Sequence, residues 1–190
     1  MKRSGWHPWH SHTISLVDPP LPKRKHYSEI LLSENKSDKL VTALDDLLVN
    51  LPDPMPLSTI IAELRSNLMR FPNALLGEVG IDRSFRVPFV PYPASSPKKL
   101  SPFTVPTLHQ LTILEAQIEV AVELRRPISM HSVKAQQITL DLLKRMKEKH
   151  KEKWGDICMD MHSCGFSAET WLEVEVHLIP TVSFIAYPRF

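Results

Sequence analysis

The sequence predicts an α/β fold with a parallel sheet, and two observations lead to this prediction. From residue 74 onward, short apolar runs alternate with longer stretches whose apolar residues recur every three or four positions. Such alternation is typical of βα units, which build parallel sheets. In addition, Glu78, His131 and His162 each stand at the carboxyl end of an apolar run, which is where such folds hold their ligands.

The first half of the chain is predicted to contain a His/Trp cluster, a Pro- and Lys-rich loop and two helices, in that order over residues 5–12, 17–28, 37–51 and 58–69. Pro52 ends the first helix because proline cannot continue one. Ser58 is the expected N-cap of the second helix. A turn then leads into the strand at 74–81, which contains Glu78.

Residues 84–106 are rich in proline and predict a long connection without helix or strand. The remaining elements are expected to be helix, strand, helix, strand, helix and strand, over 106–125, 127–131, 133–149, 157–162, 168–177 and 181–186. The basic stretch 144–153 alternates lysine with glutamate, which indicates a solvated helix face rather than a binding patch.

Composition limits the classes of function. The chain has 190 residues, enough for one domain, and its net charge of +2 gives no case for a nucleic-acid or membrane partner. No apolar run approaches the roughly 18 residues of a membrane span, and the basic N-terminus lacks the apolar core of a signal peptide. The two cysteines, six positions apart, are expected to be free thiols in an intracellular protein, cytoplasmic or nuclear.

The three strand-end residues form a ligand set. A carboxylate with two imidazoles suits Zn²⁺, Mn²⁺, Fe²⁺ or Mg²⁺, with little power to choose among them. One histidine at a strand end is more often a structural residue, but three ligand-type side chains in successive βα units favour a metal site. Gly77 and Gly80 flank Glu78 and are expected to let the backbone approach whatever Glu78 holds.

Four segments together resemble the TatD family of metal-dependent deoxyribonucleases, within the amidohydrolase-like TIM-barrel hydrolases. They are Gly-Trp-His-Pro-Trp, Gly-Glu-Val-Gly-Ile-Asp, the helix with Gln110 that runs into the strand ending in His131, and Met-His-Ser, at residues 5–9, 77–82, 110–131 and 161–163. The proline-rich segment resembles that of fungal members. The resemblance implies a partial TIM (β/α)8 barrel that lacks the first strand or strands and the last ones. It also implies one domain over 1–190, with a helical insert at about 28–71 and a Pro-rich insert at about 84–106.

The resemblance also implies residue roles. Glu78 would bridge two divalent metals (Mg, Mn or Zn), and His131 and His162 would complete one of the two metal shells. Such a centre activates water and hydrolyses phosphodiester bonds, here at DNA ends. His7 would lie near the substrate phosphate, with loop packing as an equal alternative. Asp82 would orient loops or ligands, and two cations would contact phosphate unless they are plain surface residues: Arg83 and Lys134.

The sequence departs from the family pattern at both ends. The family's first strand carries Asp-x-His-x-His, but this chain begins at the Gly-Trp-His-Pro-Trp loop. His10 and His12 do not replace that motif, because they follow the loop and no apolar strand precedes them. The late Glu-Thr-Asp segment of the family would lie beyond Phe190. We therefore expect a truncated member with impaired activity.

Two alternatives stay open. The chain could be a non-catalytic remnant of the barrel that binds a protein through its inserts or exposed edges. It could also catalyse another amidohydrolase-like reaction, such as amide or lactone hydrolysis, since the scaffold does not fix the substrate.

Overall fold

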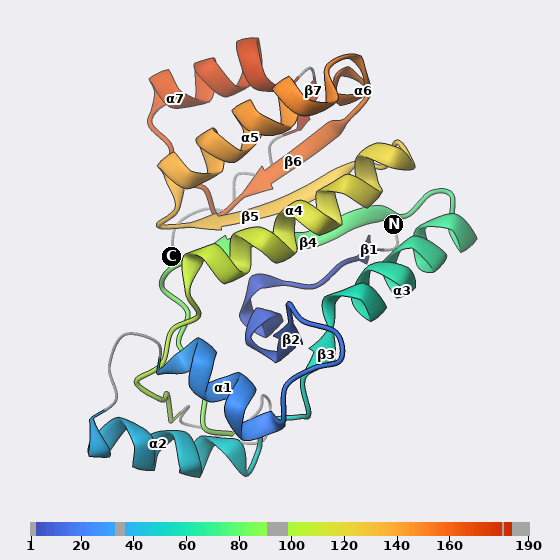
Figure 1. The fold of residues 1–190 in the computed structure, drawn as a ribbon. Helices are drawn as coiled ribbons and strands as arrows, with labels where there is room; N and C mark the ends of the chain where they lie inside the picture. Colours follow the sequence, from blue (N-terminus) through green and yellow to red (C-terminus); the bar gives the residue numbers. More distant parts are fainter. Residues whose placement is uncertain (1–2, 33–36, 91–98, 180, 184–190) are drawn as a thin grey trace.

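The computed structural model of the protein describes residues 3–32, 37–90, 99–179 and 181–183. A five-stranded sheet lies at its centre, with every strand parallel to its neighbours in the order β1-β4-β5-β6-β7 (Figure 1). These strands are β1 (Arg3–Ser4), β4 (Leu75–Asp82), β5 (Ile128–Val133), β6 (Cys158–His162) and β7 (Thr181–Ser183). A separate parallel pair consists of β2 (Ile14–Ser15) and β3 (Met55–Pro56).

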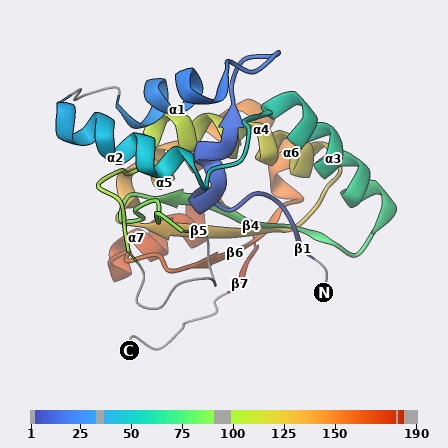
Figure 2. The ribbon, with the colours of Figure 1, turned by 90° about the horizontal axis from the view of Figure 1, so that it is seen from below.

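Helices connect the strands, and α3 and α4 lie on one side of the sheet (Figure 2). The helical elements are η1 (Pro8–Thr13), α1 (Lys23–Leu31), α2 (Asp38–Leu48), α3 (Leu57–Arg70), α4 (Thr107–Glu123), α5 (Gln136–His150), α6 (Glu152–Gly155), α7 (Ala168–Glu173) and the π-helical turn η2 (Val174–Leu178). Neighbouring parallel strands that follow one another in sequence, with helices between them, form an arc of a TIM barrel. The predicted α/β partial barrel is therefore confirmed.

Most predicted elements agree with the structure to within a few residues, but the predicted loop at 17–28 is wrong. Helix α1 begins at Lys23. Its sequence is mostly polar and only His26 and Tyr27 are buried, so it shows no apolar pattern that would predict a helix. The N-cap prediction for Ser58 is also wrong, since Pro56 holds that position and the Ser58 hydroxyl donates to the Asp18 carboxylate at 2.6 Å. The last predicted strand forms over 181–183, and its remainder lies outside the described residues.

The main hydrophobic core lies between the sheet and helices α3, α4 and α5. It includes Leu64, Leu68, Leu76, Val79, Ile81, Leu114, Ile118, Met130, Leu142 and Met159. Trp154 belongs to this core and donates its indole N–H to the carbonyl of Leu178 at 2.7 Å, which connects α6 to η2. One face of the sheet is thus closed by apolar packing, and the polar side chains of the strands gather on the other.

A second hydrophobic cluster joins α1 and α2 to the proline-rich segment. It is built from Tyr27, Leu32, Leu44, Leu47, Leu51, Val87, Phe103 and Val105. The segment 84–106 forms no helix or strand in its described part, as predicted, but Val87 and Phe89 donate backbone hydrogen bonds across it, both at 3.0 Å. Its residues 91–98 lie outside the described part. The boundaries of the two inserts stay predictions.

Strand β4 contains a β-bulge where Glu78 stands. The register with β5 shifts between Leu76 and Val79, so that one extra residue of β4 fits into this interval. Side chains alternate along a strand, and Leu76 and Val79 can both face the core only because of that extra residue. The bulge therefore turns Glu78 to the polar face, four residues before Asp82.

The two glycines that flank Glu78 allow β4 to approach β5, and the expected approach to a ligand stays a prediction. A Cβ atom on Gly77 would lie 2.7 Å from the Cβ of Ser129. One on Gly80 would lie 1.9 Å from the carbonyl oxygen of His131, and Gly80 has a φ of 155°, which favours glycine. The close contact of these two strands thus depends on the absence of side chains at both positions.

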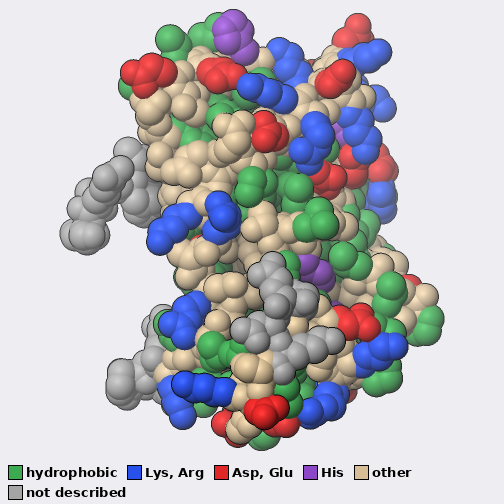
Figure 3. All heavy atoms as spheres, turned by 60° about the vertical axis from the view of Figure 1, so that its left-hand side comes forward, with side chains coloured by type: hydrophobic (Ala, Val, Ile, Leu, Met, Phe, Trp, Pro, Cys, Tyr) green, Lys and Arg blue, Asp and Glu red, His purple; other side chains and the backbone are tan. Residues whose placement is uncertain are grey.

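Charged side chains of both signs cover the α5–α7 end of the molecule, at the top of Figure 3. The basic residues of α5 pair with acidic residues of neighbouring helices, in the exposed pairs Lys144–Glu173 (2.7 Å), Arg145–Glu115 and Lys149–Glu119 (2.6 Å). The prediction of a solvated face is therefore confirmed. Cys158 and Cys164 are free thiols, also as predicted. None of the helices in the described ranges is long and apolar enough to cross a membrane.

Three buried histidines lie where η1 packs against α1 and α4. The Nε2 atoms of His26 and His109 hydrogen-bond to the backbone carbonyls of His12 and Ser11, at 3.0 and 2.9 Å. Burial lowers the pKa of all three histidines, and it lowers the pKa of His12 to about 4 with a further contribution from His10. This part of the fold therefore holds its histidines in the neutral form.

Gly80→Ala should destabilise the fold strongly. The new methyl group would overlap the backbone of His131, and we expect the free energy of unfolding to fall by about 3 kcal/mol or more, measured by urea denaturation. Gly155→Ala is the matched control, because a Cβ there meets nothing within 4 Å. Equal stability of the two variants would contradict the close strand contact.

The protein should lose stability as the pH falls from about 6.5 to 4. Over this range the unfolded state binds a proton at His12 and the folded state does not, which costs about 3 kcal/mol for this residue. Urea denaturation at several pH values should show a shallower dependence in His12→Gln than in the wild type. The same substitution at exposed His177, which removes an imidazole outside this cluster, is the control. An unchanged dependence in His12→Gln would refute the assignment.

Candidate metal centre

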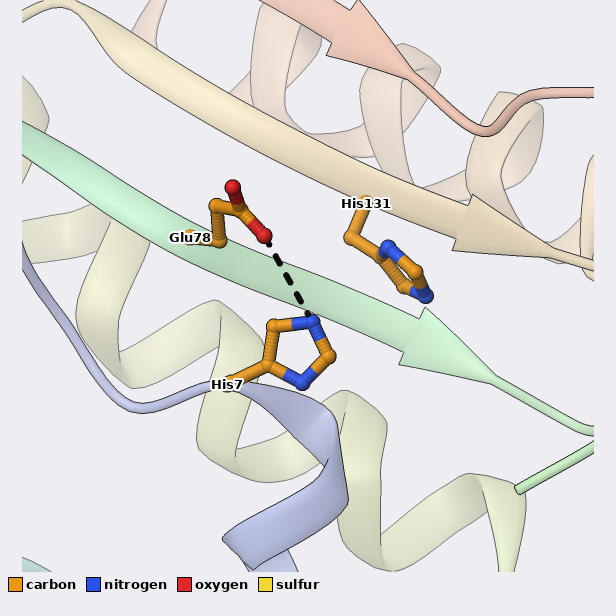
Figure 4. Close-up of side chains that lie close together, drawn as sticks. All are labelled: His7, Glu78 and His131. Carbon is orange, nitrogen blue, oxygen red and sulfur yellow. Dashed lines mark ion pairs between the residues drawn. The ribbon is translucent and has the colours of Figure 1, made fainter.

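The polar side chains converge near the carboxyl ends of β4, β5 and β6. Gly80 pairs with His131, and His131 pairs in turn with His162, so the two imidazoles stand side by side with ring centres 5.7 Å apart. His7, which lies just before η1, approaches from β1 (Figure 4). Suitable ligand atoms of His7, Glu78 and His131 lie within 4.8 Å of one another. The parallel register thus gathers ligand-type side chains at one edge of the sheet.

The Glu78 carboxylate is the centre of this group. Its Oε2 atom lies 3.5 Å from Nε2 of His162 and 3.7 Å from Nε2 of His7. Its Oε1 atom accepts a hydrogen bond from the guanidinium of Arg3, in β1. The two oxygens of Glu78 therefore face different partners, a cation on one side and imidazoles on the other.

The donor set fits a divalent cation. Metal–nitrogen and metal–oxygen bonds of about 2.1 Å at a tetrahedral angle place two ligand atoms about 3.4 Å apart, close to the 3.5 Å between Glu78 Oε2 and His162 Nε2. The Nε2 atom of His162 is buried and has no hydrogen-bond partner. A buried polar atom without a partner is costly, and a cation between His162 and Glu78 would satisfy both atoms.

His131 is held by Asp82. The Nε2 atom of His131 lies 3.2 Å from Asp82 Oδ2, which also accepts the indole N–H of Trp9 at 2.7 Å. Ser84 donates from its amide and its hydroxyl to Oδ1, both at 2.8 Å. Burial would raise the pKa of Asp82, but the hydrogen bonds from His131, Trp9 and Ser84 outweigh it and keep the pKa below its ordinary value. Asp82 is therefore an ionised acceptor that fixes the ring of His131.

Trp9 links this anchor to the second hydrophobic cluster. Its ring stacks on that of Phe85, with centres 5.2 Å apart and planes 10° from parallel, and Phe85 packs against the cluster. On the opposite side of Asp82, Gln110 accepts the backbone N–H of Asp82 at 2.8 Å and donates to its carbonyl at 3.1 Å. Asp82 is thus fixed through both its side chain and its backbone.

His7 is better suited to donate a hydrogen bond than to bind a metal. Its Nδ1 atom accepts the backbone N–H of Trp9 at 3.2 Å, so in the neutral ring the proton sits on Nε2. Burial and the neighbouring His131 lower the pKa of His7 to about 4, which keeps the ring neutral near pH 7. The atom that points toward Glu78 is therefore an N–H group, which has no lone pair to offer a cation.

The predicted site residues are not all placed alike. Glu78, His131 and His162 come together, with Asp82 beside them. Arg83 and Lys134 are both exposed, directly after β4 and β5, and the guanidinium of Arg83 donates to the Lys134 carbonyl at 3.3 Å. Their contact with phosphate stays a prediction. His12 is buried near Tyr27, with ring centres 6.3 Å apart.

The structure adds two residues to the candidate metal centre that the sequence does not predict. Arg3 lies in a strand of two residues, too short for any pattern to show. Asp160 stands two positions before His162 on β6, with its Oδ2 atom 3.6 Å from Nδ1 of His162. The alternation of side chains along a strand would have indicated that Asp160 and His162 share a face.

A family model and two relatives match this chain. A family model described as TatD related DNase matches residues 3–174. Cut9-interacting protein scn1 of Schizosaccharomyces pombe is 30% identical over 216 residues, which cover 96% of this chain and 62% of the relative. Uncharacterized deoxyribonuclease YMR262W of Saccharomyces cerevisiae is 31% identical over 132 residues, 68% of this chain and 39% of the relative.

The chain therefore spans about three fifths of the length of the first relative and about two fifths of the second. No solved structure matches it significantly. The family model nevertheless matches most of the chain, and the match includes Glu78, His131 and His162. The chain belongs to the family of TatD-related DNases.

Proposed function

We propose that the protein is a metal-dependent hydrolase of phosphodiester bonds in DNA, with a cation held by Glu78, His131 and His162. One observation carries the metal site: the buried, unpartnered Nε2 atom of His162 lies 3.5 Å from Glu78 Oε2. An imidazole lone pair and a carboxylate oxygen repel each other unless a proton or a cation lies between them. Membership of the DNase family supports DNA as the substrate.

The proposed cation is Mg²⁺, Mn²⁺ or Zn²⁺, since mixed nitrogen and oxygen ligands accept all three. When bound, it would activate a water molecule and offset the negative charge of the phosphodiester. Glu78 and His162 would hold it directly. His131 would complete the set, with its ring fixed by Asp82 at 3.2 Å.

Arg3 and His7 are suited to bind the substrate phosphate. Both lie against Glu78, and the guanidinium of Arg3 is about half exposed, at 46%. Guanidinium and neutral imidazole N–H groups donate to phosphate oxygens, and charged donors make the stronger bonds. Further phosphate contacts would come from two exposed cations at the same edge of the sheet: Arg83 and Lys134.

The described residues support one cation rather than a bridged pair. Glu78 Oε1 is occupied by the Arg3 guanidinium, and only Oε2 faces imidazole nitrogens. The bridging role implied for Glu78 would need ligands from outside the described part of the chain. Within the described part, Arg3 supplies the second positive charge at this carboxylate.

Binding to a partner protein is the second candidate function. Leu172 and Val176, on α7 and η2, are 60% and 63% exposed, and the S. pombe relative is named as a Cut9-interacting protein.

For either function we propose an intracellular location, cytoplasmic or nuclear. The free thiols of Cys158 and Cys164 support a reducing compartment.

Glu78→Gln should abolish metal-dependent cleavage of DNA. The amide keeps the shape of the side chain but removes the charge that binds the cation, so kcat/KM should fall at least ~100-fold. Release of nucleotides from DNA ends would be measured with added Mg²⁺, Mn²⁺ or Zn²⁺ and with a chelator. Glu175→Gln, on an exposed side chain, is the control. Cleavage without metal, or none with any metal, would refute the proposal for this chain.

A role in protein binding predicts a different pattern. A complex captured by the full chain should survive Glu78→Gln and weaken at least ~10-fold in Leu172→Glu, because a charge there would be buried in the interface. The affinity of each variant for the purified partner would be measured. If Glu78→Gln also abolishes the complex, the separate binding surface is wrong.

A further inference from the structure

We propose that Asp160 and Ser129 are positioning residues that keep the proton of His162 on Nδ1, so that Nε2 presents its lone pair to the cation. This inference rests on the proposed metal site and adds two residues to it. Neither touches the cation or the substrate in this arrangement. They act through the imidazole of His162.

The register of the sheet places the two residues together. Ser129 pairs with Asp160 across β5 and β6, directly before the pair of His131 and His162 on the same face. The Ser129 hydroxyl donates to Asp160 Oδ2 at 2.9 Å. Asp160 is therefore fixed on β5 and stands beside the ring of His162.

The protons in this group can be assigned one by one. The hydroxyl of Ser129 donates its proton to the hydrogen bond with Asp160. Two acceptors then face Nδ1 of His162: Ser129 Oγ at 3.5 Å and Asp160 Oδ2 at 3.6 Å. A proton on Nδ1 faces both acceptors favourably, whereas a lone pair there would be repelled by them. Because a neutral imidazole has one N–H, Nε2 is then the acceptor.

The unpaired atoms agree with this assignment. Nε2 of His162 and Oδ1 of Asp160 are both buried without a hydrogen-bond partner. A carboxylate on the far nitrogen makes an imidazole more basic and fixes its orientation toward a metal. Asp82 has the corresponding role for His131, at 3.2 Å. Each of the two histidines thus has its own carboxylate.

The tautomer of His162 tests the inference without metal or DNA. Long-range ¹H–¹⁵N spectra of the full chain, with His162 assigned by His162→Gln, should show the Nδ1–H form in the wild type. In Asp160→Asn the amide group can donate to Nδ1, so the Nε2–H form should increase. Asp156→Asn is the matched control on the approach to the same strand, because Asp156 pairs with the exposed Arg125 at 3.4 Å.

Zinc affinity is the second readout. Calorimetric titration with Zn²⁺ should give a dissociation constant about 10- to 100-fold weaker for Asp160→Asn than for the wild type, and no change for Asp156→Asn. If Asp160→Asn does not fold, Ser129→Ala removes one acceptor and should show the same changes in smaller measure. Asp160→Glu should restore part of the affinity.

The inference is overturned if wild-type His162 carries its proton on Nε2, or if Asp160→Asn binds Zn²⁺ as tightly as the wild type. Its failure can be told apart from that of the proposed function. A chain with the Nδ1–H form that does not cleave DNA would support the inference and refute the nuclease. Metal-dependent cleavage of DNA by a chain with the Nε2–H form would support the nuclease and refute the inference.

Discussion

The close contact between β4 and β5 is the constraint on which the site depends. Two positions of β4 have no side chain, and at Gly80 even a methyl group would overlap the neighbouring backbone. This contact fixes the register that aligns Gly80, His131 and His162 across three strands. The bulge before it turns Glu78 out of the core and toward the two histidines. Geometry of the backbone, rather than any one side chain, therefore brings the ligand atoms together.

Electrostatic pairing then prepares each group for its role. Asp82 and Asp160 stand on the far side of His131 and His162, and Arg3 faces the far oxygen of Glu78. For His162 and Glu78 the partner uses the atom that does not face the centre, which leaves His162 Nε2 and Glu78 Oε2 free. Hydrogen bonds of this kind hold ligands in place before a cation binds, and so lower the cost of ordering them.

The sequence predicts the sheet and the ligand-type residues Glu78, His131 and His162 because both follow from local pattern. The prediction that Glu78 stands at the end of its strand is wrong, since Glu78 lies in the middle of β4. Alternating strands and helices imply a parallel sheet, and parallel strands bring their carboxyl ends together. Contacts between distant segments have no such pattern. The Arg3–Glu78 pair and the bulge at Glu78 depend on how the strands meet. Helix α1 was missed for another reason: it has only two buried residues, His26 and Tyr27, in a polar sequence.

The stack of Trp9 on Phe85 connects the proline-rich segment to the edge of the sheet that holds the candidate metal centre. Phe85 belongs to the proline-rich segment, and Trp9 donates to the same carboxylate oxygen that holds His131. A change in the length or packing of that segment would be transmitted through two contacts to His131, a proposed metal ligand. Insertions in the proline-rich segment would therefore change how the ring of His131 is held. Relatives that differ in this segment would differ in how firmly they fix the corresponding imidazole.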